Sequence, residues 1–217
     1  MDWDKLYIKH PEFCIKEPAK EIVDFIPILK KLPGTNSEKK IYDLGFGAGR
    51  HVIYLAKQGF DVYGDDISLS GLEITRQWLK KERLSAKLGI SDMTKIPYPD
   101  DFFDAIINRG VITHNTKNGI GACIKEMYKK LKNGGKIIVT FISTESSEYG
   151  KGEKIAENTF IPTEGPEKGV IHHFVDSSEV EELMKDFKKI SLYKYRHKGL
   201  LKIGNYISAH WIYVGEK

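Results

Sequence analysis

Residues 41–51 read Ile-Tyr-Asp-Leu-Gly-Phe-Gly-Ala-Gly-Arg-His, and this stretch decides the fold. It begins as a short apolar strand, passes an acid, and then places glycines at alternate positions before a helical pattern of apolar residues. Glycines let the backbone come close to a ligand, and the free N–H groups at the start of the next helix then face that ligand. The stretch therefore predicts a nucleotide-type site at the carboxyl end of a strand in an open α/β sheet.

The spacing of the glycines distinguishes between classes of nucleotide. A dinucleotide fingerprint reads G-x-G-x-x-G, whereas here the order is Gly45-x-Gly47-x-Gly49, with Arg50 in place of the third glycine of the fingerprint. Asp43 stands two residues before the first glycine. A carboxylate repels a pyrophosphate but attracts an ammonium group, so the pattern favours a ligand that carries an ammonium.

The remainder of the chain alternates strand and helix patterns as far as residue 142. Strands are predicted at 41–44, 60–64, 86–90, 104–108 and 136–142, and helices at 17–32, 50–58, 68–83 and 120–131. Pro27 predicts a kink or break inside the first of these helices. Strands that alternate with helices favour a parallel sheet with right-handed crossovers.

The alternation stops after residue 142. Ser143–Val175 is long, polar and rich in Gly and Pro, and it carries no strong period, so we expect a functional loop there. A capping-box-like signal at 176–179 predicts a helix to about residue 187, followed by strands at 190–195 and 206–214. We expect a single domain over 1–217, divided into an N-terminal helical lid (1–39), a cofactor-binding core (40–142), a substrate or lid insertion (143–175) and C-terminal helix and strands (176–217).

The glycine stretch resembles motif I of the class I S-adenosylmethionine-dependent methyltransferases, usually D-x-G-x-G-x-G. Residues 62–68 are similar to the family's V-x-G-x-D-x-S, and residues 92–104 to D-M-x-x-[LI]-P-[FY]-x-[DN]-x-[FS]-F-D. Residues 132–135 resemble L-K-P-G-G, with Asn133 replacing the proline. Within the superfamily the likeness is to small single-domain enzymes that act on small molecules, including the tellurite-resistance-like group. The resemblance implies an α/β, Rossmann-like sheet of seven strands, mostly parallel with the last strand antiparallel, and helices on both faces.

The resemblance also implies a cofactor, S-adenosylmethionine, and its product S-adenosylhomocysteine. Asp66, about 20 residues after the glycines, would hold the ribose hydroxyls, although it also suits a helix N-cap. Asp65 and Phe46 depart from the residues common at their positions. The implied cofactor contacts, from the methionine end to the adenine, are Asp43, Gly45, Gly47, Gly49, Asp66, Ile67, Asp92, Met93 and Asn108.

The catalytic residue, by contrast, is unknown from the sequence. Methyl transfer is an in-line displacement, so the protein must align the acceptor and exclude water, and it needs a general base only if the acceptor must lose a proton. Four substrate-side candidates are His173, which related enzymes favour, His114, Tyr7 and Arg109. Each has a simpler structural alternative: a hydrogen-bonded histidine, helix packing for Tyr7, and an ion pair for Arg109.

Composition excludes several other classes of protein. No apolar run approaches the roughly 20 residues that cross a bilayer, and the N-terminus lacks the apolar segment of a signal peptide. Two cysteines are too few for a disulfide scaffold, which suggests a cytoplasmic protein. The histidines show no HxxxH or HxH spacing with carboxylates, so we expect no metal.

The expected function is in-line methyl transfer to a small-molecule acceptor. Nucleic acid is an unlikely partner, because the net charge of +4 is mild and residues 108–111 lack the two prolines and the aromatic residue of DNA amino-methyltransferases. An RNA or protein methyltransferase and a non-catalytic S-adenosylmethionine-binding protein remain alternatives. The oligomeric state stays open.

Overall fold

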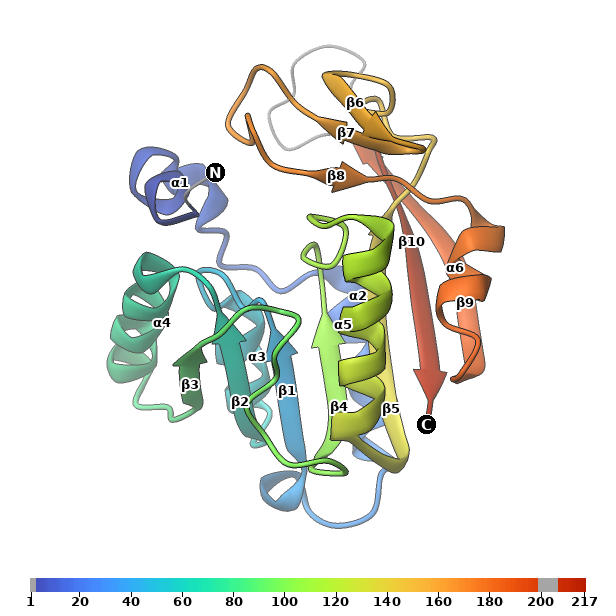
Figure 1. Cartoon of the computed structure of the whole chain (residues 1–217). Helices are drawn as coiled ribbons and strands as arrows, with labels where there is room; N and C mark the ends of the chain where they lie inside the picture. Colours follow the sequence, from blue (N-terminus) through green and yellow to red (C-terminus); the bar gives the residue numbers. More distant parts are fainter. Residues whose placement is uncertain (1–2, 199–206) are drawn as a thin grey trace.

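The computed structural model describes residues 3–198 and 207–217 and contains a central seven-stranded sheet (Figure 1). The strand order is β3-β2-β1-β4-β5-β10-β9. Strands β1 to β5 run parallel, and β10 lies antiparallel between β5 and β9. This confirms the predicted seven-stranded sheet with its last strand antiparallel. The bounds are β1 Lys40–Leu44, β2 Asp61–Asp66, β3 Lys87–Ile90, β4 Phe103–Asn108, β5 Leu131–Ile142, β9 Lys188–Lys198 and β10 Ile207–Glu216.

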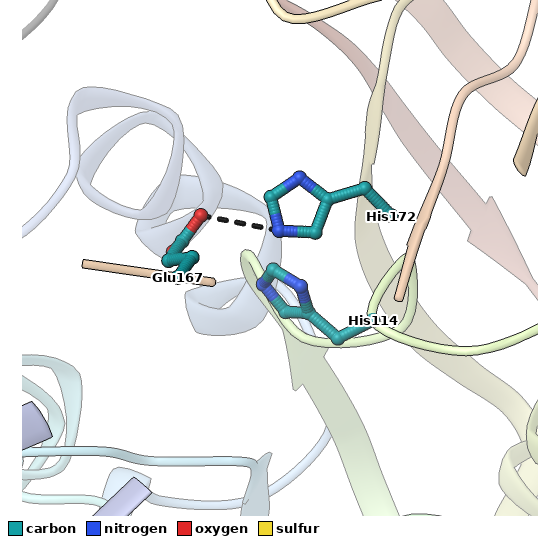
Figure 2. Close-up of side chains that lie close together, drawn as sticks. All are labelled: His114, Glu167 and His172. Atoms are coloured by element: carbon teal, nitrogen blue, oxygen red, sulfur yellow. Dashed lines mark ion pairs between the residues drawn. The ribbon is translucent and has the colours of Figure 1, made fainter. Parts of the chain in front are cut away.

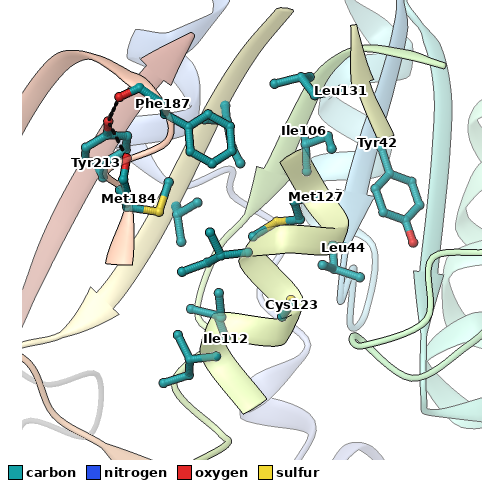
Figure 3. Packing of buried hydrophobic residues seen from close by; sticks show 14 of the residues in the cluster. Tyr42, Leu44, Ile106, Ile112, Cys123, Met127, Leu131, Met184, Phe187 and Tyr213 are labelled. Atoms are coloured by element: carbon teal, nitrogen blue, oxygen red, sulfur yellow. Dashed lines mark hydrogen bonds between the residues drawn. The ribbon is translucent and has the colours of Figure 1, made fainter. Parts of the chain in front are cut away.

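Helices cover both faces of the sheet, also as predicted (Figure 1). Alternate residues of each central strand face opposite helix layers: Ile106 in β4 packs with one layer, and its neighbour Ile107 with the other. Helices α5 and α6 lie on the first face, and α2, α3 and α4 on the second. Figure 3 shows the first face, where the free thiol of Cys123 is buried among apolar side chains. The helices are α1 Trp3–Lys9, α2 Lys20–Lys30, α3 Arg50–Lys57, α4 Leu69–Glu82, α5 Lys117–Lys130 and α6 Ser177–Leu183, with short 3₁₀ turns η1 Pro11–Phe13 and η2 Asn36–Glu38.

Pro27 lies inside α2 without breaking it. A proline at this position removes the hydrogen bond that would end on the carbonyl of Val23. Val23 is 38% exposed, so water can satisfy that carbonyl. The break that Pro27 suggested is therefore absent, because the lost hydrogen bond falls on the solvent side of the helix.

The segment Ser143–Val175 contains more regular structure than the sequence predicted. It forms a second, antiparallel sheet in the order β6-β7-β8, from strands Glu153–Ala156, Thr159–Ile161 and His172–His173. The expectation of a segment without strands was wrong, because these strands have only two to four residues and cannot show a clear period. Phe160 and Phe174 pack with Ile142 at the end of β5, so the small sheet lies beyond the carboxyl end of the large one (Figure 1).

The other segment beyond the carboxyl ends of the parallel strands is α1 (Figure 1). Both α1 and the small sheet therefore lie on the side of the molecule where open α/β sheets bind ligands. No helix of the described residues combines the length and apolar character that a membrane span requires.

Candidate cofactor and substrate site

The loop between β1 and α3 adopts a conformation that only glycine tolerates. Gly47 and Gly49 have φ values of +56° and +87°. A Cβ atom at Gly47 would lie 2.5 Å from the hydroxyl oxygen of Tyr7, and one at Gly49 would lie 2.4 Å from a side-chain carbon of Thr75. Positive φ and close neighbours together exclude a side chain at both positions. The loop backbone is consequently packed directly against the side chains of Tyr7 and Thr75.

Asp43 lies beneath this loop, where its carboxyl group is buried and its pKa is raised. The residue is 1% exposed, and its Oδ2 atom has no hydrogen-bond partner among the described residues. Burial, aided by the nearby charge of Asp66, raises the pKa of Asp43 to about 7. A buried carboxylate oxygen without a partner is costly, so a cationic group bound above the loop would stabilise the ionised form. This environment fits the ammonium group that the glycine spacing predicts.

Asp66, at the end of β2, hydrogen-bonds both the glycine loop and the residue that precedes α4. Its Oδ2 accepts a hydrogen bond from the backbone N–H of Gly47 at 2.7 Å, and its Oδ1 accepts one from the N–H of Ser68 at 2.8 Å. The N-cap of α4 is Ser68, whose hydroxyl oxygen accepts from the N–H of Gly71. Asp66 is therefore a carboxylate at the cavity wall, and the alternative that it caps the helix does not apply.

A single cavity of about 700 Å³ joins most of the predicted site residues. Asp92 lies at its rim, where its Oδ1 accepts hydrogen bonds from the backbone N–H and the hydroxyl of Thr94. Asn108 lies outside the lining and hydrogen-bonds the backbone of Leu44 and Ile112, so it shapes the wall. The predicted residues that line the cavity are Gly45, Gly47, Asp66, Ile67, Asp92 and Met93 on the cofactor side, and Tyr7, Arg109 and His114 on the substrate side. Asp43, Gly49, Asn108 and His173 do not line it.

Helix α1 covers the glycine loop and is anchored by its own acid. The Oδ1 atom of Asp4 accepts hydrogen bonds from the hydroxyl of Ser68 at 2.7 Å and from the N–H of Ser70 at 2.8 Å. This anchor holds α1 against the start of α4 and places the Tyr7 hydroxyl next to Gly47. Burial raises the pKa of Tyr7 above its ordinary value, so its phenol is neutral.

Arg109 takes part in the ion pair that was its simpler alternative. Its Nε donates to Oε1 of the buried Glu21 at 3.0 Å, yet the residue also lines the cavity. Arg50 lies in the same wall. Burial, together with the charge of Arg109, lowers the pKa of Arg50 to about 10. This wall therefore carries two guanidinium groups beside the buried carboxylates Glu21 and Asp43. A guanidinium group that faces the cavity can bind an anionic group there.

The neighbours His172 and His173 face opposite directions, as consecutive residues of a strand must. His173 hydrogen-bonds Thr159 and Glu179 at 2.8 and 2.9 Å beside a separate cavity of about 310 Å³. His172 instead lies next to His114, with ring centroids 4.9 Å apart. His173 thus lies away from the large cavity, and His172 is the one of the two that contacts His114, a residue of the cavity wall.

His114, His172 and Glu167 lie close together (Figure 2), and His114 and Glu167 line the cavity. The Nε2 of His172 lies 3.2 Å from Oε2 of Glu167. The ring of Trp3 in α1 packs edge-on against His114, and burial lowers the pKa of His114 to about 4. Sequence reasoning missed Glu167 and His172, because a search for local spacing cannot detect residues that long loops bring together.

The chain resembles known proteins both in sequence and in fold. Residues 41–135 match a family model described as a methyltransferase domain. Phosphoethanolamine N-methyltransferase 3 of Arabidopsis thaliana is 33% identical over 125 residues, which cover 57% of this chain but 24% of that protein. The chain thus spans about a quarter of the length of the curated relatives it matches first.

Solved structures resemble the chain over nearly its whole length. A protein from Pyrococcus horikoshii OT3 is 25% identical with a TM-score of 0.69, over 91% of this chain and 89% of that one. A structure described as a SAM-dependent methyltransferase from Methanosarcina mazei has a TM-score of 0.75 at 19% identity, over 88% and 97% of the two chains, and shows the shared fold. Its strand order, its glycine loop and the methyltransferase domain matched over residues 41–135 support a place in the class I S-adenosylmethionine-dependent methyltransferase superfamily.

Proposed function

We propose that this protein is an S-adenosylmethionine-dependent methyltransferase that acts on a small-molecule acceptor. The observation that carries the proposal is the single cavity of about 700 Å³. It has the glycine loop and Asp66 at one end, and His114, Arg109 and Glu167 at the other. Cavities of this size hold small ligands, and the first relative's own name describes methylation of a small phosphorylated amine.

The residues present fit S-adenosylmethionine. Asp43 supplies negative charge beneath the loop for the ammonium of the methionine end, with Gly45 and Gly47 allowing close approach. Asp66 can turn from the loop N–H groups to the ribose hydroxyls, and Ile67, Asp92 and Met93 form the wall for the adenine. The bound cofactor supplies the reactive methyl group, while the protein binds, orients and excludes water.

At the acceptor end, we propose that His114, Tyr7 and Arg109 face the substrate, in preference to His173. His114 lines the cavity, and burial lowers its pKa to about 4, so its neutral ring positions the acceptor and is too weak a base to take a proton from it. Tyr7 and Trp3 belong to α1, which covers the cavity and limits the access of water. Arg109 and Arg50 favour an acceptor that carries an anionic group.

Two other functions remain as alternatives. An RNA or protein methyltransferase needs a groove that admits a polymer, whereas α1 covers this cavity. A protein that binds S-adenosylmethionine without transferring its methyl group would need the same cofactor residues, so they cannot separate it from an enzyme. The charged side chains on the acceptor side of the cavity favour an enzyme over a protein that only binds S-adenosylmethionine.

The proposal is tested in two stages. Calorimetry with S-adenosylmethionine, S-adenosylhomocysteine and a nicotinamide dinucleotide should show binding of the first two and weak binding of the third. A screen with methyl-labelled cofactor against phosphorylated amines, other small metabolites, metalloid oxyanions and RNA should then show transfer to a small anionic acceptor. Transfer confined to RNA would replace the small-molecule acceptor. Tight cofactor binding with no transfer to any acceptor would favour the non-catalytic alternative.

A further inference from the structure

We propose that His114, Glu167 and His172 bind a divalent transition-metal cation at the acceptor end of the cavity. The three residues come from two segments: the loop that follows β4 and the stretch that leads into β8 (Figure 2). Each offers one ligand atom, and these atoms all lie within 4.8 Å of one another. Ligand atoms about 2.0–2.2 Å from a shared ion are roughly 3–4 Å apart, so small side-chain movements would complete the site.

The hydrogen bonding of the two histidines supports this assignment. His172 is 1% exposed, yet neither of its ring nitrogens has a hydrogen-bond partner among the described residues. The Nδ1 atom of His114 is also buried and has no hydrogen-bond partner among the described residues. A buried polar atom without a partner is destabilising, and a cation would supply a partner for one nitrogen of each ring.

The contact between His172 and Glu167 also fits two ligands of one ion better than it fits a hydrogen bond. The Nε2 and Oε2 atoms are 3.2 Å apart, at the long end of the range for a hydrogen bond. When a nitrogen and an oxygen both direct lone pairs at one ion, they approach each other in this way without aligning as donor and acceptor. A His–Glu proton relay would instead require a nearly linear N–H···O contact.

The ligand chemistry indicates the class of cation. Two imidazole nitrogens and one carboxylate oxygen suit Zn²⁺, Co²⁺ or Fe²⁺, whereas Mg²⁺ and Ca²⁺ prefer oxygen ligands alone. Imidazole binds such cations through a ring nitrogen in its neutral form. Zn²⁺ is the simplest probe, because it has no redox chemistry.

Three protein ligands leave at least one coordination position open. His114 and Glu167 line the cavity, so the open position faces the acceptor end, where the cation would hold an anionic oxygen or sulfur of the acceptor. This role rests on the proposed function, whereas the binding of the cation does not.

The test is a Zn²⁺ titration of the chelator-treated full chain by calorimetry, together with the absorption spectrum of the Co²⁺-loaded protein. We expect one bound ion per chain and a Co²⁺ spectrum that reports nitrogen and oxygen ligands. His172→Ala and Glu167→Gln should each weaken Zn²⁺ binding by at least about tenfold, since even indirect disturbance of a metal site costs that much. Glu167→Gln keeps the side-chain shape, so it remains informative if His172→Ala fails to fold by circular dichroism.

The matched control is His10→Ala, which removes an exposed histidine that lies 3.1 Å from a carboxylate oxygen of Glu12. This surface pair should contribute nothing to the titration. Zn²⁺ binding that His10→Ala weakens and Glu167→Gln leaves unchanged would overturn the proposal, as would no Zn²⁺ binding by the native chain. Binding of S-adenosylmethionine to the metal-free native chain is measured separately, so failure of the metal site and failure of the proposed function are distinguishable.

Discussion

Three carboxylates near the carboxyl ends of neighbouring strands have different surroundings, and these surroundings separate their roles. Asp43 is buried without a partner for one oxygen, Asp66 is held by two backbone N–H groups, and Asp92 is exposed at the rim. The same chemical group can therefore attract a cation, hold a diol or bind an amino group, depending on its burial and hydrogen bonds. The first two of these roles lead to separate predictions.

Asp66→Ala should weaken S-adenosylmethionine binding by about 10- to 100-fold. The substitution removes charged hydrogen bonds to the ribose, each contributing about 1.5–3 kcal/mol, and also releases the N–H of Gly47. Calorimetry on the native and variant chains measures the change. Asp61→Ala is the control, because Asp61 lies at the other end of the same strand and pairs with Lys87. Equal affinities for Asp66→Ala and the native chain would contradict the assignment.

The affinity for S-adenosylmethionine should rise with pH by at most about tenfold per pH unit. The rise should end at about pH 7, above which the affinity stays level. The pKa of Asp43 is about 7 in the free protein, and the cationic ligand binds its ionised form. Because this folded-state pKa lies above the ordinary value of 3.8, the unliganded chain should lose stability as pH rises from about 4 through 7. Calorimetry and thermal melts across this range test both trends, and the isosteric Asp43→Asn variant should flatten them. A pH-independent affinity in the native chain would count against the role of Asp43.

Helix α1 is held in position by a small set of polar contacts between Asp4 and the start of α4. Asp4→Ala removes the acceptor that joins α1 to Ser68 and Ser70. Loss of comparable helix-end contacts costs about 0.5–2 kcal/mol, so cofactor affinity should fall severalfold and proteolysis near residues 10–19 should accelerate. Glu12→Ala, which changes an exposed residue within η1, serves as the control. If both variants bind S-adenosylmethionine as the native chain does, α1 is not a functional lid.

The elements also show how far the sequence could predict the fold. Strands such as β4 are buried on both faces and read as apolar runs, so their position and the parallel sheet were predictable. Strand β6 could not be predicted, because all of its residues are exposed. Strand β8 could not be predicted, because it has only two residues. Short strands are specified by their pairing partners, which local sequence does not reveal.

At the scale of the whole molecule, ligand binding should stabilise the fold. S-Adenosylhomocysteine at about 100 times its Kd should add about 2.7 kcal/mol and raise the Tm by roughly 5–10 °C for a chain of this size. Differential scanning fluorimetry measures the shift, with a nicotinamide dinucleotide at equal concentration as the control. Equal shifts with both ligands would contradict the interpretation of the glycine spacing.

The sequence alone indicated the superfamily, the seven-stranded sheet with its last strand antiparallel, and a set of candidate cofactor residues. These features reside in local patterns: glycine spacing, acids at strand ends, and alternation of strand and helix. Only the tertiary structure decided the acceptor side, where it brings His114, Glu167 and His172 together and turns His173 away. The physical reason is that these contacts depend on how long connections return across the carboxyl ends of the strands. That path is set by packing between distant segments, and no local pattern encodes it.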